Sequence, residues 1–301
     1  RQLTQRLAEE RGRPFYMAVR IAGSLEMCRR IGYDIPTWIE EGLVDILIPA
    51  GNAGTDPDAK VAELVEMCQG TDVVVYPGFD GGLPGVPSGP EDTKTRDFMS
   101  VRGISSKHYR AGAKGMYLFN WHAGRDTRRE PMTQVGSVET LRKTDKIYAA
   151  TNRYILNEGD WRGAYRRDRI LGEVPVPLKS TMTQDGPTIH LVTADDFELD
   201  TPTAVQLRLR LSEWVRGDEL KILFNGKEMT DADIAYCVAV DPHQLGASAV
   251  GSFGPDVWVR FDLDAKDVPA GEHEVKVVLI KRHPQVASDL VLTDVELVVT
   301  Y

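Results

Sequence analysis

Seven polar or aromatic residues stand at or just beyond the ends of apolar segments, and their types suit contact with sugars. They are Arg20, Asn52, Tyr76, Asp80, Asn120, Trp121 and His122. A tryptophan ring can stack on the apolar face of a sugar, while arginine, asparagine and histidine can hydrogen-bond its hydroxyl groups. Glycoside hydrolysis needs two carboxylates, about 5–5.5 Å apart for retention or about 6.5–9.5 Å apart for inversion. We therefore predict Asp80 as a catalytic residue and the other six as substrate-binding residues.

Each of these residues also has a plainer interpretation. Asp80 begins the sequence Asp-Gly-Gly, which is typical of a turn. Arg20 ends a buried segment, where a structural ion pair would also offset the cost of its charge. The plainer interpretation of Asn52 is a turn residue, and that of His122 is a loop residue. For Tyr76 and Trp121 it is packing in the core. Asp80 and His122 would offer a metal ion only two ligands, so the sequence predicts no metal site.

These residues must be positioned by strands that alternate with helices. Short apolar runs predict strands over residues 15–21, 44–49, 71–77 and 115–121, with helices between them and a last helix over 137–156. Such alternation indicates parallel β/α units, in an open doubly wound sheet or in half of a barrel. No GxGxxG or phosphate loop opens a helix. Polar groups at strand ends and a long loop after the third strand favour the half barrel.

The second half has a different period. Apolar and polar residues alternate over 205–211, 220–224, 257–263, 274–279 and 290–301. Asn225-Gly226 is a strong hairpin signal. These segments predict an antiparallel, jelly-roll-like β-sandwich. The expected fold class is therefore α/β plus all-β, with a partial barrel over 1–158, a basic and then proline-rich linker over 159–178, and the sandwich over 179–301.

Composition excludes several classes of protein. The 301-residue chain carries a net charge of −9, which argues against nucleic-acid binding. No apolar run approaches the roughly 20 residues that span a bilayer. The 3 cysteines, Cys28, Cys68 and Cys237, are far apart, so they predict neither a disulfide framework nor a zinc site. Cys28 and Cys68 lie on apolar helix faces, where a small buried side chain is expected.

Several stretches together resemble a known family: Met17–Arg20, Cys28–Asp34, Trp38–Pro49 and Tyr109–Asn120. They are similar to the C-terminal half of the barrel in bacterial family-10-like glycosyl hydrolases. The stretch from Leu220–Gly226 through Val295–Tyr301 looks like the jelly-roll domain appended to such proteins.

The resemblance implies that the visible strands are the fifth to eighth of a (β/α)8 barrel, and that the first four are not in this sequence. It also implies an acid/base glutamate after the fourth strand and a nucleophilic glutamate after the seventh. The seventh strand ends Tyr76-Pro77-Gly78-Phe79-Asp80, so Asp80 stands where the family has glutamate.

The expected function is that of a glycoside hydrolase-like protein that cleaves a polysaccharide or glycoside with paired carboxylates. Two alternatives stay open. The missing glutamate favours a non-catalytic carbohydrate-binding protein, and the exposed edges of a half barrel favour assembly with another copy or another chain. A carbohydrate is the expected partner, with no cofactor. Analogy with sandwich-bearing glycosidases suggests a secreted or periplasmic protein.

Overall fold

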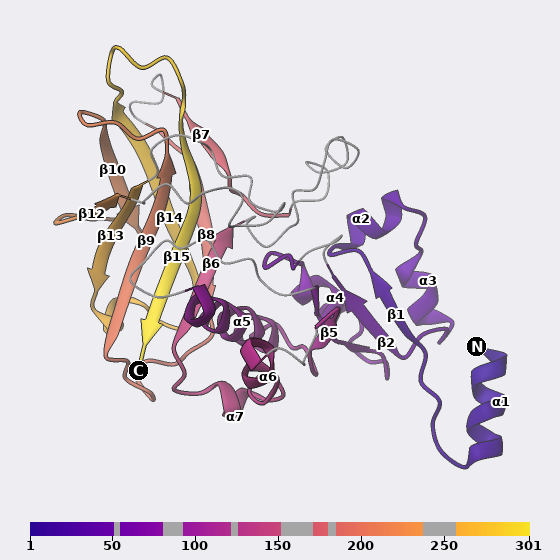
Figure 1. Ribbon diagram of the computed structural model, residues 1–301. Helices are drawn as coiled ribbons and strands as arrows, with labels where there is room; N and C mark the ends of the chain where they lie inside the picture. The colour runs from indigo at the N-terminus through magenta and orange to yellow at the C-terminus, as the bar shows by residue number, and fades with distance from the viewer. Residues whose placement is uncertain (51–54, 81–92, 122–125, 152–170, 180–184, 237–256) are drawn as a thin grey trace.

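The computed structural model describes residues 1–50, 55–80, 93–121, 126–151, 171–179, 185–236 and 257–301. Helices and short parallel strands form the N-terminal part, and long antiparallel strands form the C-terminal part (Figure 1). Within these ranges, no helix is both long enough and apolar enough to cross a membrane.

The N-terminal part alternates helices with very short strands. Its helices are α1 (Gln2–Arg11), α2 (Leu25–Arg30), α3 (Ile35–Glu40), α4 (Val61–Met67), α5 (Thr93–Arg110), α6 (Asp126–Met132) and α7 (Val138–Leu141). Its strands are β1 (Ala18–Ile21), β2 (Ile46–Pro49), β3 (Val74–Val75), β4 (Gly78–Asp80) and β5 (Tyr117–Phe119). Ser24 caps α2, because its hydroxyl accepts a hydrogen bond from the backbone N–H of Met27 at 3.2 Å.

The predicted half barrel is wrong. In the described residues the parallel strands form a three-stranded sheet, β1-β2-β3, and a separate pair, β4-β5, rather than one sheet of four β/α units. The described strands form no closed barrel, and most of them are antiparallel. The expected strand over 71–77 is split into β3 and β4 around Pro77, which has no N–H to donate to a ladder.

One face of the β1-β2-β3 sheet carries the core of the N-terminal part. Leu47 and Val75 from the strands pack with Cys28, Ile35 and Leu64 from the helices. Cys28 and Cys68 are both buried free thiols, which confirms their predicted place on apolar helix faces. Burial raises the pKa of both thiols, so neither is a ready nucleophile.

The C-terminal part consists of two antiparallel sheets that share one hydrophobic core. The four-stranded sheet runs β11 (Lys227–Glu228), β10 (Glu219–Phe224), β14 (Gly271–Lys281) and β8 (Thr188–Thr193). The six-stranded sheet contains β12 (Asp233–Tyr236), β13 (Val257–Leu263), β9 (Ala204–Ser212), β15 (Leu290–Thr300) and β6 (Lys146–Thr151), while β7 (Val176–Leu178) also pairs with β15. A short 3₁₀ helix, η2 (Ala265–Asp267), precedes β14. Side chains from both sheets meet in the core, including Leu207 and Leu209 of β9 and Val275 and Val277 of β14.

The predicted helix over 137–156 is wrong, because its described part, residues 137–151, contains a helix of one turn, α7, followed by a strand, β6. Strand β6 pairs antiparallel with β15 in the larger sheet. Helix α5 lies directly on β6. A Cβ atom at Gly103 of α5 would stand 2.0 Å from the carbonyl oxygen of Ile147, so only glycine permits this approach.

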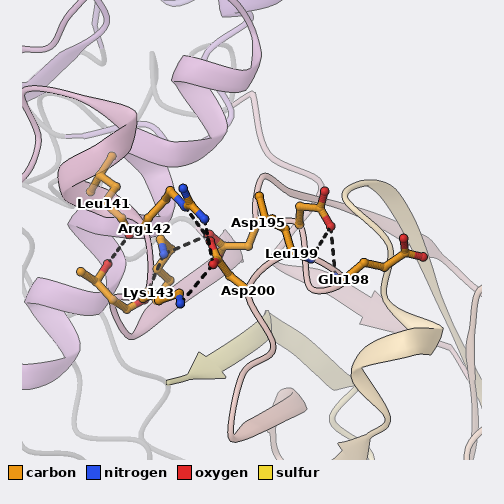
Figure 2. A network of polar contacts seen from close by, with 10 residues as sticks. Leu141, Arg142, Lys143, Asp195, Glu198, Leu199 and Asp200 are labelled. Carbon is orange, nitrogen blue, oxygen red and sulfur yellow. Dashed lines mark hydrogen bonds and ion pairs between the residues drawn. The ribbon is translucent and has the colours of Figure 1, made fainter.

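Polar contacts fix the corner between α7 and β6 against the loop that joins β8 to β9 (Figure 2). Arg142 donates two hydrogen bonds to the Asp200 carboxylate, at 2.7 Å and 2.9 Å, in the bidentate geometry that arginine favours. Asp195 accepts from the ammonium of Lys146 at 3.0 Å and from the Tyr148 hydroxyl at 2.8 Å. The Lys146 side chain is fully buried, and this desolvation lowers its pKa. The Arg142–Asp200 pair therefore joins the segment after α7 to the C-terminal part, and the Asp195 contacts fix the loop between β8 and β9 on β6.

Candidate functional site

Arg20 and Phe119 meet at the carboxyl ends of the parallel strands. Arg20 lies near the end of β1, and Phe119 is the last residue of β5. The guanidinium carbon of Arg20 lies 4.6 Å from the centroid of the Phe119 ring, a cation–π contact. Phe119 is 37% exposed, although it is a large apolar residue. Arg20 was predicted from its place at a strand end, whereas Phe119 was not, although it directly precedes the predicted Asn120.

Two tyrosines extend this surface on the same side of the strands. Tyr117 and Phe119 are two residues apart in β5, so they share a face, and their rings stack with centroids 6.5 Å apart. A Cβ at Gly115, which precedes them on the same face, would meet the Tyr76 ring at 2.9 Å. We call Arg20, Tyr76, Tyr117 and Phe119 together the aromatic face.

The other side of β5 faces the interior. Leu118 and Trp121 pack against the small core cluster that includes Phe79 and Val101. Trp121 meets Phe79 edge to face, with ring centroids 6.2 Å apart. The structure therefore places Trp121 in a packing position, away from the aromatic face. Asn120 is exposed and adopts a positive φ of 50°, which turns the chain out of β5.

The backbone of Asp80 lies beside this surface. Asp80 of β4 pairs in register with Phe119 of β5, so the two residues occupy the same edge. The side chain of Asp80 lies outside what the structure describes, and Asn52 and His122 lie outside the described residues altogether. In the described ranges, no group of three or more histidine, cysteine, aspartate or glutamate residues could hold a metal ion.

A second candidate site lies where the two parts of the chain meet. A cavity of about 590 Å³, which we call the joint cavity, opens between the C-terminal end of α5, the segment before and into α4, and strands β8 and β14. Its charged lining includes Lys107, Arg110, Glu173, His190 and Glu272. These residues are far apart in the sequence, so no local motif could have predicted their meeting.

The segment before α4 forms one wall of the joint cavity. Asp56, Pro57 and Asp58 precede α4, which begins at Val61. Asp56 is buried, and its carboxylate accepts a hydrogen bond from the backbone N–H of Asp58 at 2.9 Å. Burial raises the pKa of Asp56 to about 6; the nearby charge of Asp58 adds to this, and backbone hydrogen bonds from Asp58 and Leu171 oppose it. Lys107 bridges the Pro57 carbonyl at 2.8 Å and the Asp58 carboxylate at 3.0 Å.

Two histidines line the joint cavity, one buried and one about half exposed. His108 is buried, and this burial lowers its pKa to about 3, with the charge of Lys107 adding to the shift, so its ring is neutral. His190 is about half exposed, and its Nδ1 lies 2.7 Å from a Glu173 carboxylate oxygen. The other Glu173 oxygen accepts from the His190 backbone N–H at 2.6 Å. Glu173 is thus held in one orientation at the cavity wall.

No protein-family model and no curated protein matches the chain. Among solved structures, it is weakly similar to a two-domain esterase (CEX) active on acetylated mannans, co-crystallized with mannopentaose, with a TM-score of 0.23 and 11% identity. The alignment covers 93% of this chain and 78% of that chain. A second crystal structure of such an esterase gives a TM-score of 0.22 and 10% identity, covering 93% of this chain and 79% of that one. Similarity at this level transfers neither fold nor function to the chain.

Proposed function

We propose that the protein binds a carbohydrate on the aromatic face. The observation that carries this proposal is the Arg20 guanidinium over the exposed Phe119 ring, 4.6 Å from its centroid, at the carboxyl ends of the strands. Aromatic rings offer an apolar surface that the C–H groups of a sugar ring can cover. Arginine carries five N–H donors in a rigid fork, which suits neighbouring hydroxyl groups.

The arrangement also supports a neutral ligand. Contact with the Phe119 ring restricts the Arg20 guanidinium, so less conformational entropy is lost when a ligand binds. The half-buried rings of Tyr76 and Tyr117 lie on the same face, and each hydroxyl can both donate and accept a hydrogen bond. A surface that mixes ring faces with hydroxyl and guanidinium groups suits a polyhydroxylated molecule.

A second candidate function is glycoside hydrolysis at the same edge. Its support is the register that pairs Asp80 with Phe119, which brings one carboxylate-bearing residue to the aromatic face. Hydrolysis by paired carboxylates needs a second such group across the scissile bond. The binding function needs no such partner, so we place it first.

Calorimetric titration of the full chain with cellopentaose, xylopentaose and mannopentaose tests the binding proposal. We expect at least one of them to bind, and Phe119→Ala to weaken it about tenfold, the equivalent of about 1.4 kcal/mol. Phe15→Ala is the matched control. Phe15 is 39% exposed, and Arg11 lies over its ring at 5.4 Å, but it precedes β1 at the opposite end of that strand. The proposal fails if no oligosaccharide binds, or if the two variants bind equally well.

Release of reducing ends from the same oligosaccharides separates the two candidate functions. If the protein is a hydrolase with Asp80 as its carboxylate, wild type cleaves the bound sugar and Asp80→Asn does not. Binding without cleavage by wild type would exclude hydrolysis of these sugars and leave the binding function. Equal cleavage by both proteins would remove Asp80 from the catalytic role.

A further inference from the structure

We propose that the joint cavity is a second ligand site, which takes a small zwitterion with an aliphatic body, of the chemical class of a dipeptide. The cavity lies between the two parts of the chain, away from the aromatic face, and none of the four residues of that face lines it. Its volume of about 590 Å³ falls within the range of about 300–1,000 Å³ that is usual for small-molecule sites.

The wall formed by α5 and the start of α4 carries three cationic side chains and one carboxylate, Asp58, which pairs with Lys107. Lys60, Lys107 and Arg110 all line it. Lys107 is held in place by the Pro57 carbonyl and the Asp58 carboxylate. Arg110 donates from Nη2 to the Ala270 carbonyl at 3.3 Å, and its guanidinium has further N–H groups for a ligand. Arg110 is therefore the residue on this wall best placed to bind a carboxylate.

The opposite wall, on the sandwich side, is acidic. Glu272 is exposed on β14 and pairs in register with Val192 of β8, which also lines the cavity. Glu173 also lines the cavity, and both of its carboxylate oxygens contact His190 of β8. An ammonium group near this wall would meet two carboxylates, one of them already oriented. Charges of opposite sign on facing walls favour a ligand that carries both signs itself.

The remaining surface of the joint cavity is small and aliphatic. It is formed by Ala59, Val61, Ala62, Ala111, Ala150, Leu171, Val192 and Gly271. Among the described lining residues there is no phenylalanine, tyrosine or tryptophan, so the cavity lacks the ring surface on which a sugar would stack. Small aliphatic side chains between the charged walls suit the methyl or isopropyl groups of an amino-acid-like ligand.

Calorimetric titration of the full chain with L-alanyl-L-alanine tests this proposal, with end-blocked versions of the same molecule as chemical controls. We expect the free dipeptide to bind, and both N-acetyl-alanyl-alanine and alanyl-alanine amide to bind at least tenfold more weakly. Arg110→Gln should remove the preference for the free carboxylate, and Glu272→Gln the preference for the free ammonium. Arg110→Lys, which keeps the charge, should restore part of the affinity.

Lys114→Gln and Glu9→Gln serve as matched controls, because both residues are exposed and neither lines the joint cavity. They should bind the dipeptide as wild type does. Absence of dipeptide binding would overturn the proposal. So would equal binding of the free and end-blocked dipeptides, or equal loss in the control variants. An oligosaccharide that bound with the same Arg110 and Glu272 dependence, in place of the dipeptide, would reassign the cavity to a polyol.

Discussion

The N-terminal parallel strands and the C-terminal antiparallel sheets differ in strand length and in the burial of their side chains. Strands β1 to β5 have two to four residues each, whereas β9, β14 and β15 have nine to eleven. Side chains from both antiparallel sheets fill one core, which contains fully buried residues such as Leu207 and Leu297. Among the parallel strands, Leu47 and Val75 pack against helices, whereas Tyr117 and Phe119 of β5 stay partly exposed.

This difference indicates that the antiparallel part mainly stabilises the fold, while the strand ends of the parallel part are available for ligand binding. Apolar area removed from water stabilises a fold by about 25 cal/mol per Å². The antiparallel part, with its larger core cluster, therefore supplies most of the stability. Aromatic groups that are left partly exposed at strand ends contribute less to folding and are available for ligands.

The largest expected effect lies in the antiparallel core. Leu209 of β9 is fully buried, so Leu209→Ala should lower the free energy of unfolding by about 4 kcal/mol. Ile46 of β2 is only half-buried, and Ile46→Ala should cost about 1–2 kcal/mol. Urea unfolding followed by circular dichroism measures both. Equal losses in the free energy of unfolding would contradict the larger contribution of the antiparallel part.

Asp56, at the joint between the two parts, predicts a pH-dependent effect. Its pKa is about 6 in the folded chain against an ordinary value of 3.8, so the folded state binds the proton more tightly. Ionised Asp56 therefore disfavours folding at neutral pH, and its contribution to stability rises as the pH falls from about 7 to about 4. Asp56→Asn should raise the unfolding free energy at pH 8 by up to about 3 kcal/mol.

The measurement for Asp56 is urea unfolding at several pH values between 4 and 8, on wild type and variant. The difference between them should be largest at pH 8 and shrink toward pH 4. Asp72→Asn is the control, since Asp72 is exposed. A difference that does not vary with pH would contradict the assignment of the raised pKa to Asp56.

The contact between α5 and β6 predicts a smaller effect on stability, opposite in sign to the usual effect of replacing glycine in a helix. Replacing glycine by alanine within a helix normally stabilises it by up to about 1 kcal/mol. Gly103→Ala should instead destabilise the chain by about 2 kcal/mol, because the new Cβ would collide with the Ile147 carbonyl. Gly136→Ala is the control, because a Cβ there would meet no atom within 4 Å. Thermal unfolding distinguishes them, and a stabilised Gly103→Ala would mean that α5 does not lie on β6 in this way.

The smallest effect on stability is expected on the aromatic face. Phe119→Ala removes a partly exposed ring, so its cost should stay near 1 kcal/mol, although binding should weaken about tenfold. Urea unfolding of the variant beside Leu209→Ala gives the comparison. A loss for Phe119→Ala as large as that for Leu209→Ala would make Phe119 a core residue and remove it from the proposed site.

The sequence predicted the long antiparallel strands well, because period-two alternation persists over most of β9, β13, β14 and β15. The Asn225-Gly226 turn between β10 and β11 is confirmed, since both residues have positive φ values of 50° and 80°. Strand β6 was missed. Its pairing partner β15 lies more than 140 residues away, and nothing local in Lys146–Thr151 indicates that pairing. The half-barrel prediction was wrong because alternating strand and helix segments predict β/α units but do not determine how many strands pair in one sheet.

The candidate sites were also only partly predictable from the sequence. The position of Arg20 at a strand end was visible in the sequence, whereas its contact with Phe119 depends on how β1 and β5 are arranged in space. The joint cavity depends on six separate segments, so sequence spacing could not predict it. The raised pKa of Asp56 is likewise a product of tertiary burial.

Hydrogen–deuterium exchange tests most directly whether binding is confined to the parallel strands. It is measured with and without a saturating concentration of the pentaose that binds most tightly. The account predicts added amide protection in β1 and β5, around Arg20 and Phe119, and no change in β9 and β13, whose pairing is already complete. Protection confined to the antiparallel strands, or no change anywhere, would contradict it.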